Sequence, residues 1–234
     1  MDVSDLARAL WGTGMIIRGG FHPRAEDGVP TSAPAGTLIM IGNAGGAMWR
    51  AFTRSREFNE RARRPAPLDE WTERVLRDVG EEMGFTVLFP FQGPPYHPFQ
   101  QWAQRADAVS PSPVGPLIHP EFGLWHAYRG AFVTAARLDL PVPAHAPDPC
   151  SACDDKPCLS TCPVDAFGPD GYAVARCLSH LQTPEGEDCI NLGCRARRAC
   201  PVGTAYQYVP AQAAFHQGHF LRSSGLQDDP EPGF

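Results

Sequence analysis

Cysteine is absent from the N-terminal part of this chain of 234 residues, where most of the core must lie. All eight cysteines fall between Cys150 and Cys200. In a chain without a secretion signal, cysteines gathered in this way favour metal binding over a disulfide framework. The length allows one sizeable core and a smaller second domain.

The sequence also lacks a basic N-terminal segment, a long apolar run and an excess of positive charge. Its start, MDVSDLARALW, carries Asp2 and Asp5, and the charge-free stretch at 31–49 is mostly small residues. We therefore expect no signal peptide, no membrane span and a cytoplasmic location. The net charge of −6 disfavours a nucleic-acid partner, and the arginine run from Arg54 to Arg64 is interpreted as a solvated helix face.

Short apolar runs bounded by turns predict strands, and longer periodic stretches predict helices. The strands are expected at 15–17, 37–41, 86–91 and 131–136, and the helices at 3–11, 47–64 and 68–84. A further short helix is expected before the last strand. This order predicts an α+β fold in which helices cover a mixed sheet.

A proline-rich stretch, LPVPAHAPDP at 140–149, has no periodicity and predicts a semi-rigid connector. We expect a first domain at 1–143 and a second, cysteine-rich domain at 144–222. The last residues, 223–234, are interpreted as a polar tail.

The cysteines form two groups, each closed by a Cys-Pro pair. In chain order they are Cys150, Cys153, Cys158 and Cys162, then Cys177, Cys189, Cys194 and Cys200. Eight thiolates match the ligand demand of two 4Fe–4S clusters. In two-cluster ferredoxins the cysteine before proline binds the other cluster, which here moves Cys200 to the first group and Cys162 to the second. The alternatives are a zinc site, a disulfide frame and a ligand role for His180.

The second cysteine group lies in a longer stretch of distinctive sequence. ARCLSHLQTPEGEDC, followed by GCRARRACP, resembles the C-terminal part of epoxyqueuosine reductases. This resemblance implies a small ferredoxin-like domain in which two 4Fe–4S clusters deliver electrons to a cobalamin.

Another distinctive stretch, HPEFGLWHAYRG at 119–130, precedes the cysteines. It resembles the HPxFGxWxAxRG segment of the CblC family, cytosolic proteins that bind cobalamin and remove its upper ligand on a nitroreductase-like fold. The earlier piece PAGTLIMIGNAGGAMWRAF resembles a strand–loop–helix of the same family. The resemblance implies that the cofactor is bound by His119, Phe122, Gly123, Trp125, Tyr128 and Arg129.

These residue types suit contact with a flat ring. Gly123 lets a ring approach the backbone, Trp125 and Tyr128 offer stacking area, and Arg129 can pair bidentately with a carboxylate or phosphate. Taken singly, each could instead be a core residue or an ion-pair partner. The proline-rich run at 89–106 could cover a ligand or be a packed surface loop.

Four histidines are candidates for cobalt ligation or proton donation, namely His22, His97, His119 and His126. No DxHxxG signature occurs, which favours a cobalt without a histidine ligand. Asp107 is a candidate acid by position alone, and an exposed loop residue is the alternative.

These expectations combine into a CblC-like domain joined to a two-cluster ferredoxin domain. Electrons from an external redox protein or small reductant would pass through the clusters to a bound corrinoid, for corrinoid processing or corrinoid-dependent reduction. The alternatives are an electron carrier without corrin, an enzyme closer to epoxyqueuosine reductase that acts on a modified nucleoside, and FMN in place of corrin. A homodimer is one option for the assembly.

Overall fold

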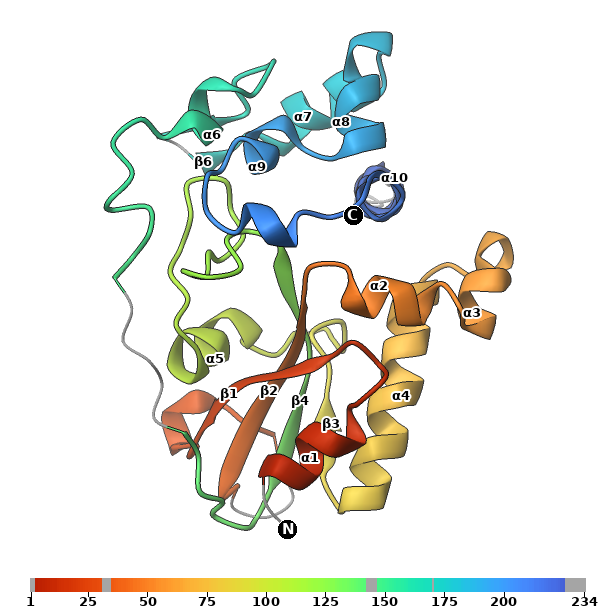
Figure 1. Cartoon of the computed structure of the whole chain (residues 1–234), viewed down its shortest axis with the longest axis vertical. Coiled ribbons are helices and arrows are strands. Elements are labelled where there is room, and N and C mark those ends of the chain that lie inside the picture. Colours follow the sequence, from red (N-terminus) through yellow and green to blue (C-terminus); the bar gives the residue numbers. More distant parts are fainter. Residues whose placement is uncertain (1–2, 31–34, 142–146, 170, 226–234) are drawn as a thin grey trace, which may run out of the picture. The chain divides into compact units, whose positions relative to one another are not determined.

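The computed structural model describes residues 3–30, 35–141, 147–169 and 171–225. The chain divides into two compact units, which are described separately (Figure 1). The first unit combines Met1–Ser110 with Trp125–Pro147, and the second combines Pro111–Leu124 with Asp148–Phe234.

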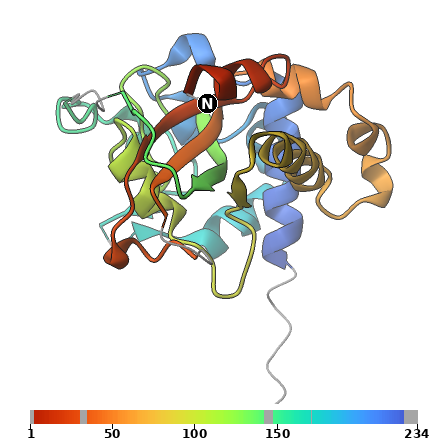
Figure 2. The same ribbon diagram turned by 90° about the horizontal axis from the view of Figure 1, so that it is seen from below.

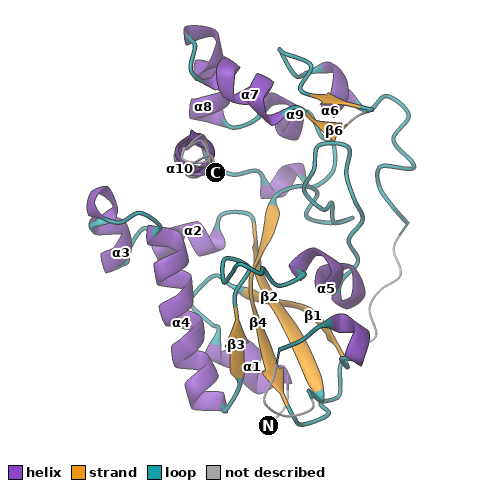
Figure 3. Cartoon of the chain, turned by 180° about the vertical axis from the view of Figure 1, so that it is seen from behind, coloured by secondary structure: helices purple, strands orange, loops and turns teal. Residues whose placement is uncertain are grey.

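The first unit is built on a four-stranded sheet, whose strands are orange in Figure 3. The strands are β1 (Ile16–Phe21), β2 (Thr37–Ala44), β3 (Thr86–Leu88) and β4 (His126–Thr134), in the order β1-β2-β4-β3. All four predicted strands are confirmed. β4 begins at His126, before the predicted run, because its first residues pair with β2 beyond a register shift at Ile41/Gly42.

The expectation of a mixed sheet is wrong for the described strands. All three neighbouring pairs are antiparallel. β2 and β3 both run antiparallel to β4, so they share one direction, but β4 lies between them. The helical connection from β2 leads to β3 on the far side of β4, so β2 and β3 are not neighbours and form no parallel pair.

The predicted helices at 3–11 and 68–84 are confirmed, whereas the single helix predicted at 47–64 is wrong, because that stretch is divided into three short pieces and Ser55 begins a new helix by accepting from the Phe58 N–H. The helices of the first unit are α1 (Val3–Ala9), η1 (Ala25–Asp27), α2 (Ala47–Phe52), α3 (Arg56–Asn59), η2 (Arg61–Arg63), α4 (Pro67–Met83) and α5 (Phe99–Ala106). α4, seen end-on in Figure 2, buries Trp71, Leu76 and Val79 and packs on β3 and β4. It ends at Gly84, which takes the left-handed conformation that favours glycine.

The second unit consists of short elements around the cysteines. They are α6 (Pro157–Ser160), β5 (Phe167–Gly168), β6 (Gly171–Tyr172), α7 (Val174–Leu181), η3 (Pro184–Gly186), α8 (Glu187–Leu192), α9 (Arg195–Arg198), η4 (Thr204–Tyr206) and α10 (Pro210–Gly225). α10 packs against α7 and α8. The predicted tail at 223–234 starts within α10, and its remainder, like residues 142–146 of the predicted connector, falls outside the described residues.

The segment Pro111–Leu124 belongs to the second unit, although the sequence boundary assigned it to the first domain. Val114, Ile118 and Leu124 are buried in one cluster with Ala196 and Cys200. Apolar packing across a long sequence separation thus decides this grouping. Within the described residues, each helix is too short or too polar to cross a membrane.

Candidate metal centre

The eight cysteines are distributed over turns and the ends of short helices in the second unit, and all are free thiols. Cys158 lies on α6, Cys177 on α7 and Cys189 on α8, while Cys194 precedes α9 and Cys200 follows it. Short helices joined by tight turns can bring such positions together although they are far apart in the sequence.

The first cysteine set consists of Cys150, Cys153, Cys158 and Cys200. The pKa of Cys150 is raised to about 11, mainly by burial and in addition by Asp148 and the other three cysteines of the set. Burial also raises the pKa of Cys158, with added effects from Cys200 and Cys153. These mutual effects show that the four thiols lie within electrostatic reach of one another.

The second cysteine set consists of Cys162, Cys177, Cys189 and Cys194. All four line one pocket, the thiol pocket, together with Phe167, His180, Leu181, Arg195, Ala196 and Gln217, among others. Burial raises the pKa of Cys194, to which Cys189 and Cys177 add. Burial also raises the pKa of Cys177, while a hydrogen bond with the Tyr172 hydroxyl lowers it.

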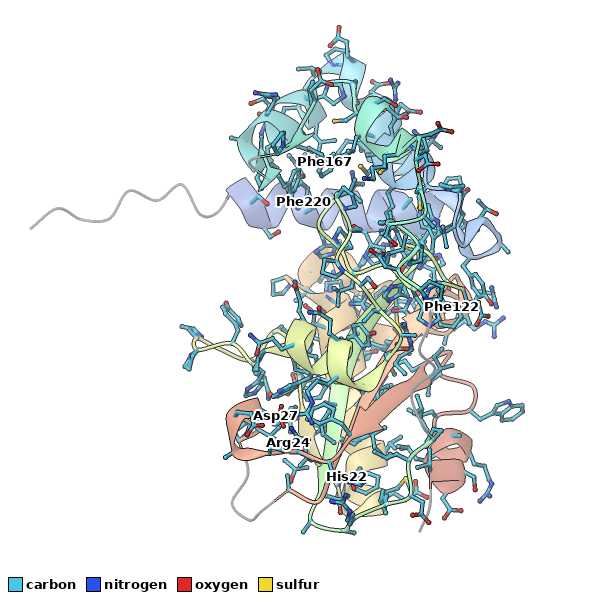
Figure 4. The ribbon with its side chains drawn as sticks, turned by 90° about the vertical axis from the view of Figure 1, so that its left-hand side faces the viewer. His22, Arg24, Asp27, Phe122, Phe167 and Phe220 are labelled. Carbon is cyan, nitrogen blue, oxygen red and sulfur yellow. The ribbon has the colours of Figure 1, made fainter. Side chains whose placement is uncertain are left out.

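Three aromatic side chains stack beside this second set, of which Phe167 lines the thiol pocket and Tyr172 forms a hydrogen bond with Cys177. The rings of Phe167 and Tyr172 stack with centroids 4.8 Å apart, and Tyr172 and Phe220 stack at 6.5 Å. Phe167 comes from β5 and Phe220 from α10, and both are labelled in Figure 4. The backbone N–H of Ala166 donates to the Cys162 sulfur at 3.3 Å.

The donor chemistry of each set fits a 4Fe–4S cluster. Each offers four thiols, and buried thiols with raised pKa values keep their protons until a metal replaces them. Among the described residues, no group of three or more His, Cys, Asp or Glu side chains is arranged to hold a metal ion. A cube places each thiolate on a separate iron, so its ligands are spread more widely than those of a single ion.

An unpartnered buried atom also points to a missing group in the second set. Nε2 of His180, which lines the thiol pocket, is buried and has no hydrogen-bond partner among the described residues. The two sets coincide with the crossed arrangement expected from the ferredoxin rule, and the assignment of individual ligands stays a prediction. His180, named in the sequence analysis as an alternative ligand, follows Cys177 by three residues on α7, and both line the thiol pocket.

Three of the predicted cofactor-binding residues lie in the second unit. The rings of His119 and Phe122 stack at 4.3 Å, and Phe122 contacts Tyr206 edge-on. Gly123 has a φ of 57°, and a Cβ there would meet the Val202 oxygen at 2.0 Å. In this structure the small size of Gly123 allows the loop after Cys200 to approach.

Two further contacts join the 119–124 loop to the first cysteine set. The Nε of Arg197 donates to the Leu124 oxygen at 3.0 Å, and the Tyr206 hydroxyl donates to Glu121. A Cβ on Gly203 would lie 2.3 Å from the carbonyl carbon of Phe122. The loop and the Cys200 turn are therefore interlocked.

The other three predicted residues lie in the first unit. Trp125 is buried, and its carbonyl accepts from the Gly45 N–H at 2.8 Å. Arg129 donates from Nε to the Asn43 side chain at 3.3 Å, and its Nη1 lies 3.9 Å from Asp69. Burial raises the pKa of Asp69, against the lowering effect of Arg129.

Tyr128 belongs to a buried polar network. Its hydroxyl donates to Oδ2 of Asp107 at 2.9 Å, and Nη2 of Arg18 lies 2.7 Å from the same oxygen. Burial raises the pKa of Tyr128, and the Asp107 charge adds to this effect while Arg18 opposes it. Asp107 is thus a partly buried acceptor. The single arginine in the run MIIRGGF was the signal for Arg18, which the sequence analysis missed.

The remaining candidates have structural partners. Nδ1 of His22 lies 2.8 Å from the Gly36 oxygen, and His97 stacks on Trp102 at 5.8 Å. His126 is buried against the Tyr128 ring. In the arginine run, Arg64 pairs with Glu60 and Glu70, while its neighbours Arg54, Arg56, Arg61 and Arg63 are exposed.

The class of fold is an α+β protein in which helices cover an antiparallel sheet, joined to a cysteine-rich unit. Among solved structures, the fold is similar to that of the C. elegans B12-trafficking protein CblC, a homologue of human MMACHC, with a TM-score of 0.53 and 13% identity over 93% of this chain and 95% of that chain. It is also similar to selenomethionine-labelled epoxyqueuosine reductase, with a TM-score of 0.50 and 14% identity over 90% of this chain and 68% of that one. No protein-family model and no curated protein matches the chain. The predicted resemblance to both proteins is confirmed at the level of fold.

Proposed function

We propose that this protein passes electrons from two 4Fe–4S clusters to a cobalamin, for reductive corrinoid processing or corrinoid-dependent reduction. The observation that carries the proposal is the division of eight free thiols into two sets of four. The fold adds support, because one structural relative is a B12-trafficking protein and another a reductase by name. An oxidoreductase is the enzyme class that these features favour.

Each cysteine set would hold one cluster, and the clusters would supply one-electron transfer. The surrounding residues would bury the thiols and exclude water from the clusters. This burial, together with hydrogen bonds to sulfur such as that from the Ala166 N–H to Cys162, would set the reduction potentials of the clusters. The first set would be the one next to the predicted cofactor-binding loop, because Val202 and Arg197 tie that loop to the Cys200 turn. The electron donor would be a redox protein or a small reductant.

Anaerobic purification followed by iron and sulfide assays tests the cluster content. We expect about eight irons per chain and a broad visible absorbance that bleaches on reduction. Fewer than about six irons per chain would contradict the two-cluster proposal, because two cubes need eight.

Addition of hydroxocobalamin to the cluster-loaded protein tests the corrinoid part. We expect a shifted corrin spectrum and retention of the corrinoid with the protein on a sizing column. If neither occurs while the clusters are intact, the protein is an electron carrier without corrin. A yellow chromophore released on denaturation would instead identify a flavin.

A further inference from the structure

His180 stands between the second cysteine set and solvent. It lines the thiol pocket and also an open groove, whose other residues include Arg176, Ser179 and Glu185. Four residues border both spaces and form a dividing wall, namely Pro163, Val164, His180 and Arg195. His180 is the one histidine of this wall, and it follows Cys177 by one helical turn on α7.

The backbone of His180 is held firmly in place. Its carbonyl oxygen accepts from the Thr183 N–H at 3.0 Å and from the Thr183 hydroxyl at 2.9 Å. A Cβ on Gly186 would lie 2.1 Å from the same oxygen, so the turn after α7 packs tightly against it. The ring therefore projects from a fixed position.

The Nε2 atom of this ring is buried without a hydrogen-bond partner among the described residues. Burying a polar atom unpaired is unfavourable, and folded proteins almost always satisfy such atoms. Of the two spaces that His180 borders, the thiol pocket is the one lined by the second cysteine set, where a cluster would present sulfur acceptors. A sulfur of that cluster would satisfy Nε2–H.

We propose that His180 donates a hydrogen bond from Nε2 to a sulfur of the cluster held by the second cysteine set, and so raises the reduction potential of that cluster. This inference rests on the proposed function. Reduction adds negative charge to the cluster, and a donor to sulfur stabilises the reduced form more than the oxidised form. His180 would be a positioning and tuning residue, and the four cysteines would be the ligands.

The variant must remove the donor without opening the pocket to water, because exposure to solvent also changes cluster potentials. His180→Leu keeps the apolar bulk and removes the donor, whereas His180→Gln keeps an N–H. Ser179→Ala is the matched control, because Ser179 is the neighbouring residue on α7 and lines the groove alone.

Redox titration of the anaerobic full-length protein, followed by EPR, measures the midpoint potential of each cluster. For His180→Leu we expect one midpoint to fall by the equivalent of about a tenfold change in the reduced-to-oxidised ratio, which is about 59 mV for one electron. His180→Gln should retain most of the wild-type value, and Ser179→Ala should leave both midpoints unchanged. Iron content should stay at the wild-type level in all three variants.

Unchanged midpoints in an iron-replete His180→Leu protein would overturn the tuning role. Loss of iron in both His180 variants would overturn it as well, by making His180 a ligand. If the leucine variant does not fold, hyperfine spectroscopy of wild-type protein labelled with ¹⁵N-histidine decides between the alternatives. A histidine nitrogen that donates a hydrogen bond to the cluster should couple weakly to the cluster's electron spin, and a nitrogen bound to iron should couple strongly. A ring that contacts no cluster should show no coupling, which would overturn the proposal. A wild-type protein without clusters would refute the proposed function itself, and this inference with it.

Discussion

At the scale of single residues, the buried carboxylate of Glu57 makes stability depend on pH. Glu57 accepts from Nε of Arg74 at 2.8 Å and from Nη2 at 3.2 Å. The hydrogen bond from Arg74 is the main reason that the pKa of Glu57 falls from 4.5 to about 2, against the opposing effect of burial. Because the pKa of Glu57 is lower in the folded state than in the unfolded state, its ionised carboxylate stabilises the folded protein at pH values above about 4.5. This stabilisation is lost as the pH falls from about 4.5 toward 2.

Glu57→Gln should lower the free energy of unfolding at pH 7 by about 1.5–3 kcal/mol, the range for hydrogen bonds to charged groups. Urea denaturation at pH 7 and at pH 3 measures the effect, and the difference from wild type should shrink at pH 3. Glu73→Gln on α4 is the control, because Glu73 pairs with Arg77 at the exposed surface and should matter by less than about 1 kcal/mol. Equal effects of the two substitutions at pH 7 would contradict the special role of Glu57.

Gly123 offers a second test at this scale. An alanine there must adopt a positive φ and also displace Val202, so we expect Gly123→Ala to destabilise the second unit by about 2 kcal/mol or more. Gly28→Ala is the control, because Gly28 has a nearly equal φ of 59° but open space around it. Thermal unfolding of both variants separates the close approach from the backbone conformation, and similar losses would show that the contact with Val202 matters little.

At the scale of elements, much of the architecture could be predicted from the sequence and part of it could not. The four strands and α4 follow from local periodicity, because each buries one face or run of its own residues. The membership of Pro111–Leu124 could not be predicted, because it depends on packing against Ala196 and Cys200, far along the chain. The spacing predicted which cysteines group together, and their assignment to individual clusters stays a prediction. The position of His180 in the dividing wall could not be predicted, because it depends on the orientation of α7.

The two cysteine loops lead to a prediction about ligand loss at the same scale. Cys162→Ser should remove the same EPR signal as Cys177→Ser, and Cys200→Ser should remove the signal that Cys150→Ser removes. Each variant should retain about four irons, since one cube persists when the other is lost. If Cys162→Ser and Cys150→Ser remove the same signal, each loop holds its own cluster and the crossed arrangement is wrong.

At the scale of the whole molecule, the two units should respond differently to metal removal. The second unit has a core in which Cys200 is buried and Cys150, Cys158, Cys162 and Cys194 pack against it. Because metal binding to such a site contributes to folding free energy, the cluster-free protein should lose local stability there. The sheet of the first unit has a core of its own, which includes Leu38, Met40, Ile41 and Phe132.

Hydrogen exchange of the cluster-loaded and cluster-free proteins measures this difference. We expect amides of α7, α8 and α9 to exchange at least tenfold faster without clusters, while amides of β2 and β4 keep their protection. Wild-type protein reloaded with iron and sulfide is the control and should regain the slow exchange. Equal acceleration in both units would contradict separate stabilisation.

Because Pro111–Leu124 belongs to the second unit, neither unit can be cut out of the chain as one continuous fragment. The chain passes from one unit to the other after Ser110, after Leu124 and after Pro147. Each unit is therefore made of two separate stretches of sequence. Cutting the chain at 143/144 would leave the cysteine-rich fragment without Val114, Ile118 and Leu124, which cover Ala196 and Cys200. The cysteine-rich unit is therefore not contained in one continuous stretch of sequence, and a fusion or exchange made at 143/144 would remove part of its own core.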